Sequence, residues 1–214
     1  MKMAGDVFVS AAVEGIVDEA VVRKLITYVH AKVGDVYGKK GKSYLRNKIM
    51  GYNNAAQHRP WIILVDLDNN FDCAPLLRQA WLPDPSPRLC FRVAVREIEA
   101  WLLADRERIA QFLSVALSKV PLYPEDLENP KEFIVNLSRV SRRRDIRQDM
   151  VPRPESGRQI GQAYPSRLIE FISKYWRPDI ASEQSISLKR AIRCLRALSE
   201  GIIDPQGMQA SGRS

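Results

Sequence analysis

Short apolar segments that alternate with helical patterns constrain the fold of this chain more than any other feature. The clearest apolar segments span residues 7–13, 61–65 and 89–95. Segments of this length and composition are typical of strands in the interior of a sheet. Apolar residues recur at helical spacing over 17–33, 44–56 and 74–81, and a weak strand is predicted at 36–37. Because alternating strands and helices specify a parallel sheet, we predict an α/β fold with about four parallel strands flanked by helices.

Residues after Asp105 are predicted to form a mostly helical C-terminal extension. The helices predicted from residue 97 onward are 97–104, 106–119, 131–142, 167–175 and 188–199. Three prolines and two glycines predict a loop over 150–165. The predicted organisation is therefore a strand-containing domain over 1–105, a helical extension over 106–206 that packs on it, and a flexible tail over 207–214.

Acidic residues follow three of the four predicted strands. They are Glu14 with Asp18, Asp66 with Asp68, and Glu97 with Glu99. Ligand sites of open parallel sheets lie beyond the carboxyl ends of the strands, so we expect these acids to converge there. Asp18 lies one helical turn after Glu14, and side chains two residues apart on an extended segment leave on the same side.

Carboxylates gathered in this way repel one another unless a cation is bound. With only two histidines and no C-x-x-C motif, any metal site must use oxygen ligands, which favours Mg²⁺ or Mn²⁺. A single acid after a strand is usually a helix cap or a loop residue. An E-x-x-x-D motif combined with a D-x-D motif some fifty residues later favours a metal site instead.

Two segments resemble the motifs of the Toprim fold, which is found in type IA topoisomerases, bacterial primases and OLD-family nucleases. They are V-E-G-I-V-D-E at 13–19 and I-L-V-D-L-D-N at 63–69. The E-x-x-x-D form is most similar to the OLD nucleases, which bind two metals and cut nucleic acid. Segment 96–105 is similar to small stand-alone Toprim-like proteins, often encoded beside an ATPase. The resemblance implies that 1–105 is a metal-binding domain, that a separate ATPase is a partner, and that the catalytic residues are Glu14, Asp66, Asp68 and Glu97.

The chain departs from the OLD pattern in two respects. It contains no ATPase domain, and it has no clear counterpart of the catalytic lysine, for which Lys174 and Lys189 are candidates. Of the two acids after the fourth strand, we expect Glu97 to face the metals and Glu99 to lie in the first turn of the next helix. The alternative for this pair is an ordinary ion pair with Arg92 or Arg96.

Positive charge is concentrated in the C-terminal third, where basic residues outnumber acidic ones 14 to 6 between Arg139 and Arg196. This pattern predicts nucleic acid as a partner, and a solvated surface is the alternative. The candidate phosphate contacts are Arg142, Arg143, Arg144, Lys189, Arg190, Arg193 and Arg196. The glycine- and lysine-rich turn at 38–42 is predicted to be an exposed basic loop.

The function favoured by these patterns is Mg²⁺- or Mn²⁺-dependent hydrolysis of DNA or RNA phosphodiesters, in genome defence with a separate ATPase. A Toprim-like regulatory subunit with little activity of its own is the main alternative, and a nucleotidyl- or phosphotransferase is a third. Three widely spaced cysteines argue against disulfides and favour a cytoplasmic protein. No apolar stretch is long enough to span a membrane.

Overall fold

The computed structural model describes residues 7–68 and 71–203 and contains a four-stranded parallel sheet. The strands are β1 (Phe8–Val13), β2 (Lys32–Gly38), β3 (Trp61–Asp66) and β4 (Leu89–Ala94), in the spatial order β2-β1-β3-β4. Register places Ala11 opposite Val36 on β2 and opposite Ile62 on β3. The predicted α/β fold with parallel strands flanked by helices is confirmed.

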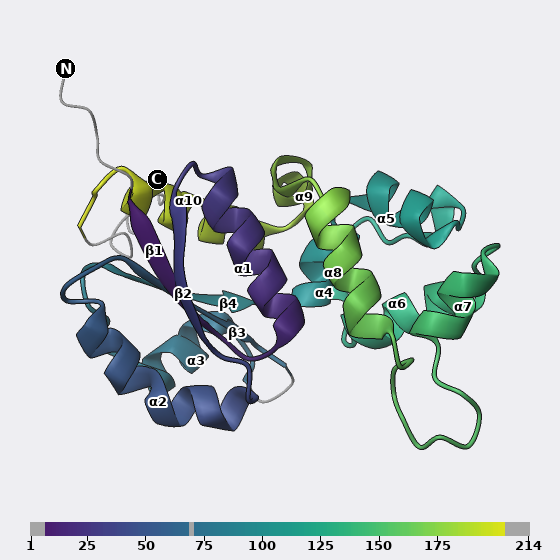
Figure 1. Cartoon of the computed structure of the whole chain (residues 1–214), viewed down its shortest axis with the longest axis horizontal. Coiled ribbons are helices and arrows are strands. Elements are labelled where there is room, and N and C mark those ends of the chain that lie inside the picture. Colours follow the sequence, from purple (N-terminus) through teal and green to yellow (C-terminus); the bar gives the residue numbers. More distant parts are fainter. Residues whose placement is uncertain (1–6, 69–70, 204–214) are drawn as a thin grey trace. The chain divides into compact units, whose positions relative to one another are not determined.

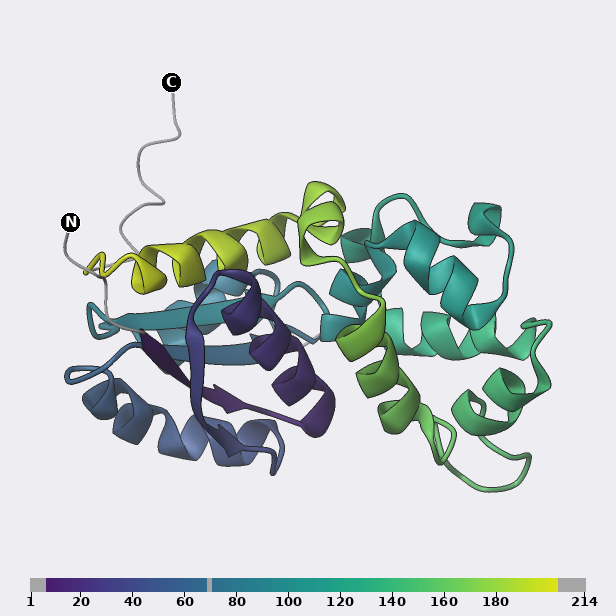
Figure 2. The ribbon, with the colours of Figure 1, turned by 45° about the horizontal axis from the view of Figure 1, so that its top comes forward.

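Helices cover both faces of this sheet (Figure 1). One face packs on α2 (Lys42–Ala55) and α3 (Ala74–Trp81), where Leu45 and Leu77 join a core with Ile63 and Phe91. The other face is covered by α1 (Ile16–Tyr28) and α10 (Ile186–Ser199), which lies along the strands in Figure 2. All six residues of β3 and of β4 are buried, which explains their nearly continuous apolar sequence.

The first helix and second strand differ from the sequence prediction. Helix α1 ends at Tyr28 rather than near Val33, because His30 takes a left-handed backbone with φ 61°. The helix predicted over 17–33 is therefore too long, and Gly34, the residue after it, lies inside β2. A Cβ at that position would come within 2.9 Å of the Ser10 hydroxyl, so glycine permits the close approach of β1 and β2.

The chain forms two compact units whose limits differ from the predicted domain limits. Of the described residues, the first unit contains 7–67, 71–93 and 189–203, and the second contains 68 and 94–188. The last helix thus belongs mainly to the sheet unit, although it is separated from the strands in sequence. The tail predicted at 207–214 lies outside the described residues.

Every regular element of the second unit is helical within the described residues. These elements are α4 (Ile98–Leu103), α5 (Arg106–Leu113), η1 (Leu117–Lys119), η2 (Pro124–Asp126), α6 (Pro130–Arg139), α7 (Arg144–Met150), α8 (Tyr164–Lys174) and α9 (Pro178–Gln184). Helices α7 and α9 were not predicted because each has only seven residues, too few to establish a period. The predicted helix over 106–119 ends early, where Ser114 adopts a left-handed conformation.

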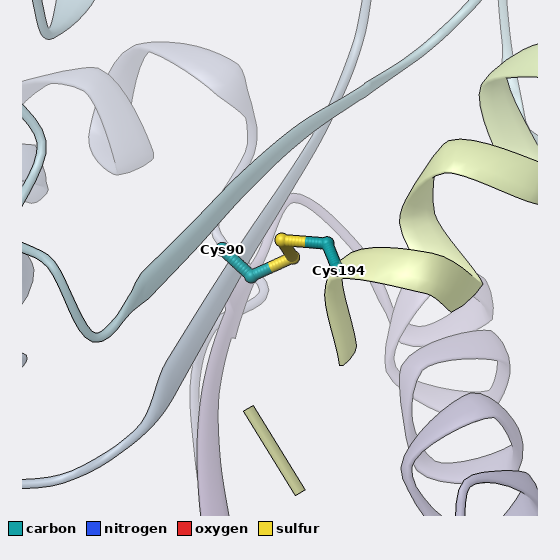
Figure 3. The surroundings of a disulfide bond; sticks show 2 residues. All are labelled: Cys90 and Cys194. Carbon is teal, nitrogen blue, oxygen red and sulfur yellow. A yellow bond between two sulfur atoms is a disulfide. The ribbon is translucent and has the colours of Figure 1, made fainter. Parts of the chain in front are cut away.

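A disulfide joins the beginning of β4 to α10. Cys90 and Cys194 are 104 residues apart in sequence, and their Cα atoms are 6.0 Å apart (Figure 3). The expectation that the cysteines do not pair is therefore wrong. The pairing could not be predicted from the sequence, because residues 94–188, which fold as a separate unit, lie between the two cysteines in the chain.

Candidate metal centre

Glu14 and Asp66 meet at the carboxyl ends of adjacent parallel strands. Glu14 directly follows β1, and Asp66 is the last residue of β3. The backbone N–H of Asp66 donates a hydrogen bond to Glu14 Oε1 over 3.0 Å, although the residues are 52 positions apart. Asp66 is only 9% exposed. The convergence predicted for this pair is thus present, and it follows from the pairing of β1 with β3.

Asp18 lies in the first turn of α1, close to the same strand end. Its Oδ2 atom is 3.1 Å from the point where a Cβ would stand on Gly15. The absence of a side chain at Gly15 lets the carboxylate turn back toward the end of β1. Asp18 is 7% exposed, and its charge is also favoured by the positive end of the helix dipole.

The glycine-rich turn after β2 brings a lysine to this edge of the sheet. A Cβ on Gly38 would lie 2.1 Å from the carbonyl oxygen of Val13, so only glycine fits against β1. Two backbone hydrogen bonds hold the turn against β1, from Lys39 N–H to Val13 O (2.9 Å) and from Gly41 N–H to Glu14 O (3.0 Å). The turn therefore wraps around the Glu14 backbone and starts α2 beside it.

Lys42 is the cation that this turn positions. Its Nζ donates to the carbonyl oxygen of Asp66 at 2.5 Å and lies 3.4 Å from that of Leu67. The sequence predicts this lysine in an exposed basic loop, whereas its Nζ lies at the candidate site. The signal that could have located it is a glycine-lysine pair directly after a strand, at the same sheet edge as the acids.

Asp68 belongs to the second unit, where it contacts the segment after β4. Its N–H donates to the carbonyl oxygen of Arg96 at 2.8 Å, and Arg96 Nη1 donates to the Asp68 carbonyl at 3.3 Å. Both residues have left-handed backbones, with φ of 53° and 60°. Such conformations are costly for arginine and often occur at functional sites.

Glu97 and Glu99 also lie in the second unit, on either side of the start of α4. Glu97 is the residue before the helix, and Glu99 lies in its first turn, as predicted. Glu97 accepts hydrogen bonds from the backbone N–H (2.8 Å) and the Nζ (3.0 Å) of Lys131. Its partner is thus Lys131, in place of the Arg92 or Arg96 considered from sequence.

Glu99 is buried, with an exposed fraction of 2%. The hydroxyl of Tyr164 donates to its Oε1 at 3.3 Å, and Lys131 Nζ lies 3.8 Å from the same oxygen. Burial raises the pKa of Glu99, and the positive charge of Lys131 only partly opposes this. Burial also raises the pKa of Tyr164, and the negative charges of Glu99 and Glu97 raise it further. These four side chains form a polar group inside the helical unit.

Carboxylate oxygens near a sheet edge are the donors that Mg²⁺ and Mn²⁺ prefer, and Glu14, Asp18 and Asp66 fit this chemistry. They are not gathered into a ready ligand set, however. Within residues 7–68 and 71–203, no three His, Cys, Asp or Glu side chains are placed to hold a metal ion together. The Oε1 atom of Glu14 accepts a hydrogen bond from the backbone of Asp66, and its other carboxylate oxygen can still coordinate a metal.

The predicted nucleic-acid contacts fall in both units. Arg142, Arg143 and Arg144 belong to the second unit, and Lys189, Arg190, Arg193 and Arg196 are exposed along α10 in the first. Arg143 forms an ion pair with Asp145. The candidate catalytic lysine Lys174 pairs with Glu170 at 3.3 Å on the surface of α8, and Lys189 is exposed.

Comparisons of the chain with protein-family models, with curated proteins and with solved structures find no match. The candidate site therefore has to be judged on its own geometry. Among the helices formed by the described residues, none has the length and apolar character needed to cross a membrane.

Proposed function

We propose that this protein is a Toprim-like, Mg²⁺- or Mn²⁺-dependent hydrolase of nucleic acid phosphodiesters. The observation that carries the proposal is the meeting of Glu14 and Asp66 at the carboxyl ends of neighbouring parallel strands. Open parallel sheets bind ligands at this edge. The motifs V-E-G-I-V-D-E and I-L-V-D-L-D-N supply both acids, so the resemblance and the geometry support the same location.

The side chains of the first unit suggest a role for each group in such a reaction. Glu14, Asp18 and Asp66 would hold the metal. When bound, such an ion activates water and offsets charge on a phosphate. Lys42 adds a fixed positive charge beside Asp66, where it can favour an approaching phosphate. The exposed basic residues of α10 would contact the rest of the nucleic acid backbone.

A cleavage assay tests this function. The whole chain is incubated with single-stranded DNA, double-stranded DNA or RNA, in Mg²⁺, Mn²⁺ or EDTA. We expect cleavage only with metal, reduced about 100-fold in Asp66→Asn because a ligand is lost. Asp35→Asn is the matched control, since it removes the same charge from an exposed position on β2. Cleavage that persists in EDTA, or that is equal in both variants, would contradict the proposal.

A regulatory subunit with little activity of its own is the second candidate. It is favoured by the pairing of Glu97 with Lys131 and of Glu14 with the Asp66 backbone, which leaves the carboxylates engaged within the protein. On this alternative, Mn²⁺ binds and Asp66→Asn abolishes binding, but no substrate is cut unless a partner such as a separate ATPase is added. A role in genome defence remains part of the proposal, whereas the cytoplasmic location loses the support of unpaired cysteines because Cys90 and Cys194 are bonded.

A further inference from the structure

An arginine cluster surrounds the edge strand of the sheet. Arg92 lies on β4, which forms the end of the strand order, and only 5% of this residue is exposed. The positive charges of Arg78 on α3 and of Arg190 and Arg193 on α10 act on it. These four residues form the arginine cluster. All of them belong to the first unit.

The disulfide explains how α10 brings its arginines to β4. Cys194 is bonded to Cys90, so this part of the helix lies directly over the strand (Figure 3). Arg92 is two residues beyond Cys90 and therefore leaves the strand on the same face. Arg190 is one helical turn before Cys194, and Arg193 is its neighbour in sequence. Both are exposed, so the cluster reaches from the interior to the surface.

Arg92 is an unusual group to bury. Within the described part of the chain, nothing accepts a hydrogen bond from its Nε atom. Burial, followed by the charges of the three other arginines, lowers the pKa of Arg92 to about 9, so the group is still charged at neutral pH. The charges of the described residues that act on Arg92 are all positive, and a buried charge in such surroundings is strongly unfavourable. An anion bound among the arginines would remove this penalty.

We propose that the arginine cluster is a binding site for a phosphate group, with Arg92 at its base and Arg190 and Arg193 at its exposed rim. Guanidinium groups donate paired hydrogen bonds that match the oxygens of phosphate. Several oxygens on one phosphorus atom can accept from several arginines at once. The phosphate could belong to a nucleic acid backbone or to a small phosphorylated compound, and both supply the same chemistry.

The arginine cluster lies near the candidate metal centre, but its proposed function does not require a metal. Trp61 N–H donates to Arg88 O, so Asp66 lies opposite the last residue of β4, two positions beyond Arg92. Strand geometry then separates the Cα atoms of Asp66 and Arg92 by about 8 Å, with both side chains on one face. Phosphate binding by arginines needs no metal, so it can be tested in EDTA.

The test measures thermal unfolding and calorimetric binding of inorganic phosphate in EDTA, at constant ionic strength with chloride as the reference. We expect phosphate to raise the melting temperature of the whole chain, because a ligand of the folded state stabilises it. Arg92→Met should weaken phosphate binding about tenfold or more, as should Arg190→Met, since each loses a charge-assisted hydrogen bond. Arg190 is exposed, so its replacement tests the site even if Arg92→Met does not fold.

Arg108→Met is the control, because it removes an exposed arginine that lies outside the cluster and outside the candidate phosphate contacts. It should change phosphate affinity by less than about twofold. Equal losses in Arg190→Met and Arg108→Met would overturn the proposal, as would a melting temperature that does not respond to phosphate. If a single-stranded oligonucleotide displaces the phosphate, the site serves nucleic acid. Phosphate that stays bound assigns the site to a small phosphorylated compound.

Discussion

Replacing Glu14 with glutamine should separate its structural role from its role toward a metal. The amide keeps an oxygen that can accept the hydrogen bond from Asp66 N–H, which is 3.0 Å long in the native protein. Only the negative charge is lost. A hydrogen bond to a charged acceptor contributes about 1.5–3 kcal/mol, and one to a neutral acceptor contributes about 1 kcal/mol. The free energy of unfolding in EDTA should therefore fall by about 1 kcal/mol.

The metal-dependent part of the stability should change more. Mn²⁺ at one hundred times its dissociation constant stabilises the native protein by about 2.7 kcal/mol. If losing the charged ligand weakens binding about 100-fold, the same Mn²⁺ concentration stabilises Glu14→Gln by only about 0.4 kcal/mol. Urea unfolding with Mn²⁺ and with EDTA measures both quantities. Equal stabilisation of the two proteins by Mn²⁺ would refute the placement of Glu14 at a metal centre.

Three further outcomes concern stability. Asp105 is fully buried and accepts three hydrogen bonds from Arg177 (backbone N–H 2.9 Å, Nε 3.1 Å, Nη2 2.6 Å), so Arg177→Met should cost about 3–5 kcal/mol in urea unfolding. A loss below about 1 kcal/mol would show that solvent replaces the guanidinium. Because burial raises the pKa of Glu99, the native protein should lose stability as the pH rises from the ordinary glutamate value through that raised pKa. Relative to Glu99→Gln, the loss should be about 1.4 kcal/mol per pH unit in this window, measured in EDTA, and parallel pH profiles would contradict it. Replacing Cys194 with serine opens a cross-link across 104 residues and should lower the free energy of unfolding by about 4.7 kcal/mol. A reducing agent should lower the stability of the native protein but not that of Cys194→Ser.

Much of the fold could be predicted from local patterns. Strands β3 and β4 are recognisable because burial on both faces requires an unbroken apolar run, and the acids at their ends follow from chain order. Strand β2 was largely missed, because none of its seven residues is fully buried and its sequence carries little apolar signal. For the same reason, the helix predicted over 17–33 runs past the end of α1 at Tyr28 and into β2.

The alternation of strands and helices, the parallel sheet and the positions of Glu14, Asp18 and Asp66 at strand ends can be predicted from the sequence. These features depend on periodicity and on residues close together in the chain. The partners of the acidic side chains and of β4 depend on how distant segments pack. Lys42 reaches Asp66, Lys131 pairs with Glu97, and α10 brings its arginines to β4 through backbone pairing and packing between distant segments. Such contacts leave no local pattern, since their energy depends on burial and charge that exist only after the chain has folded.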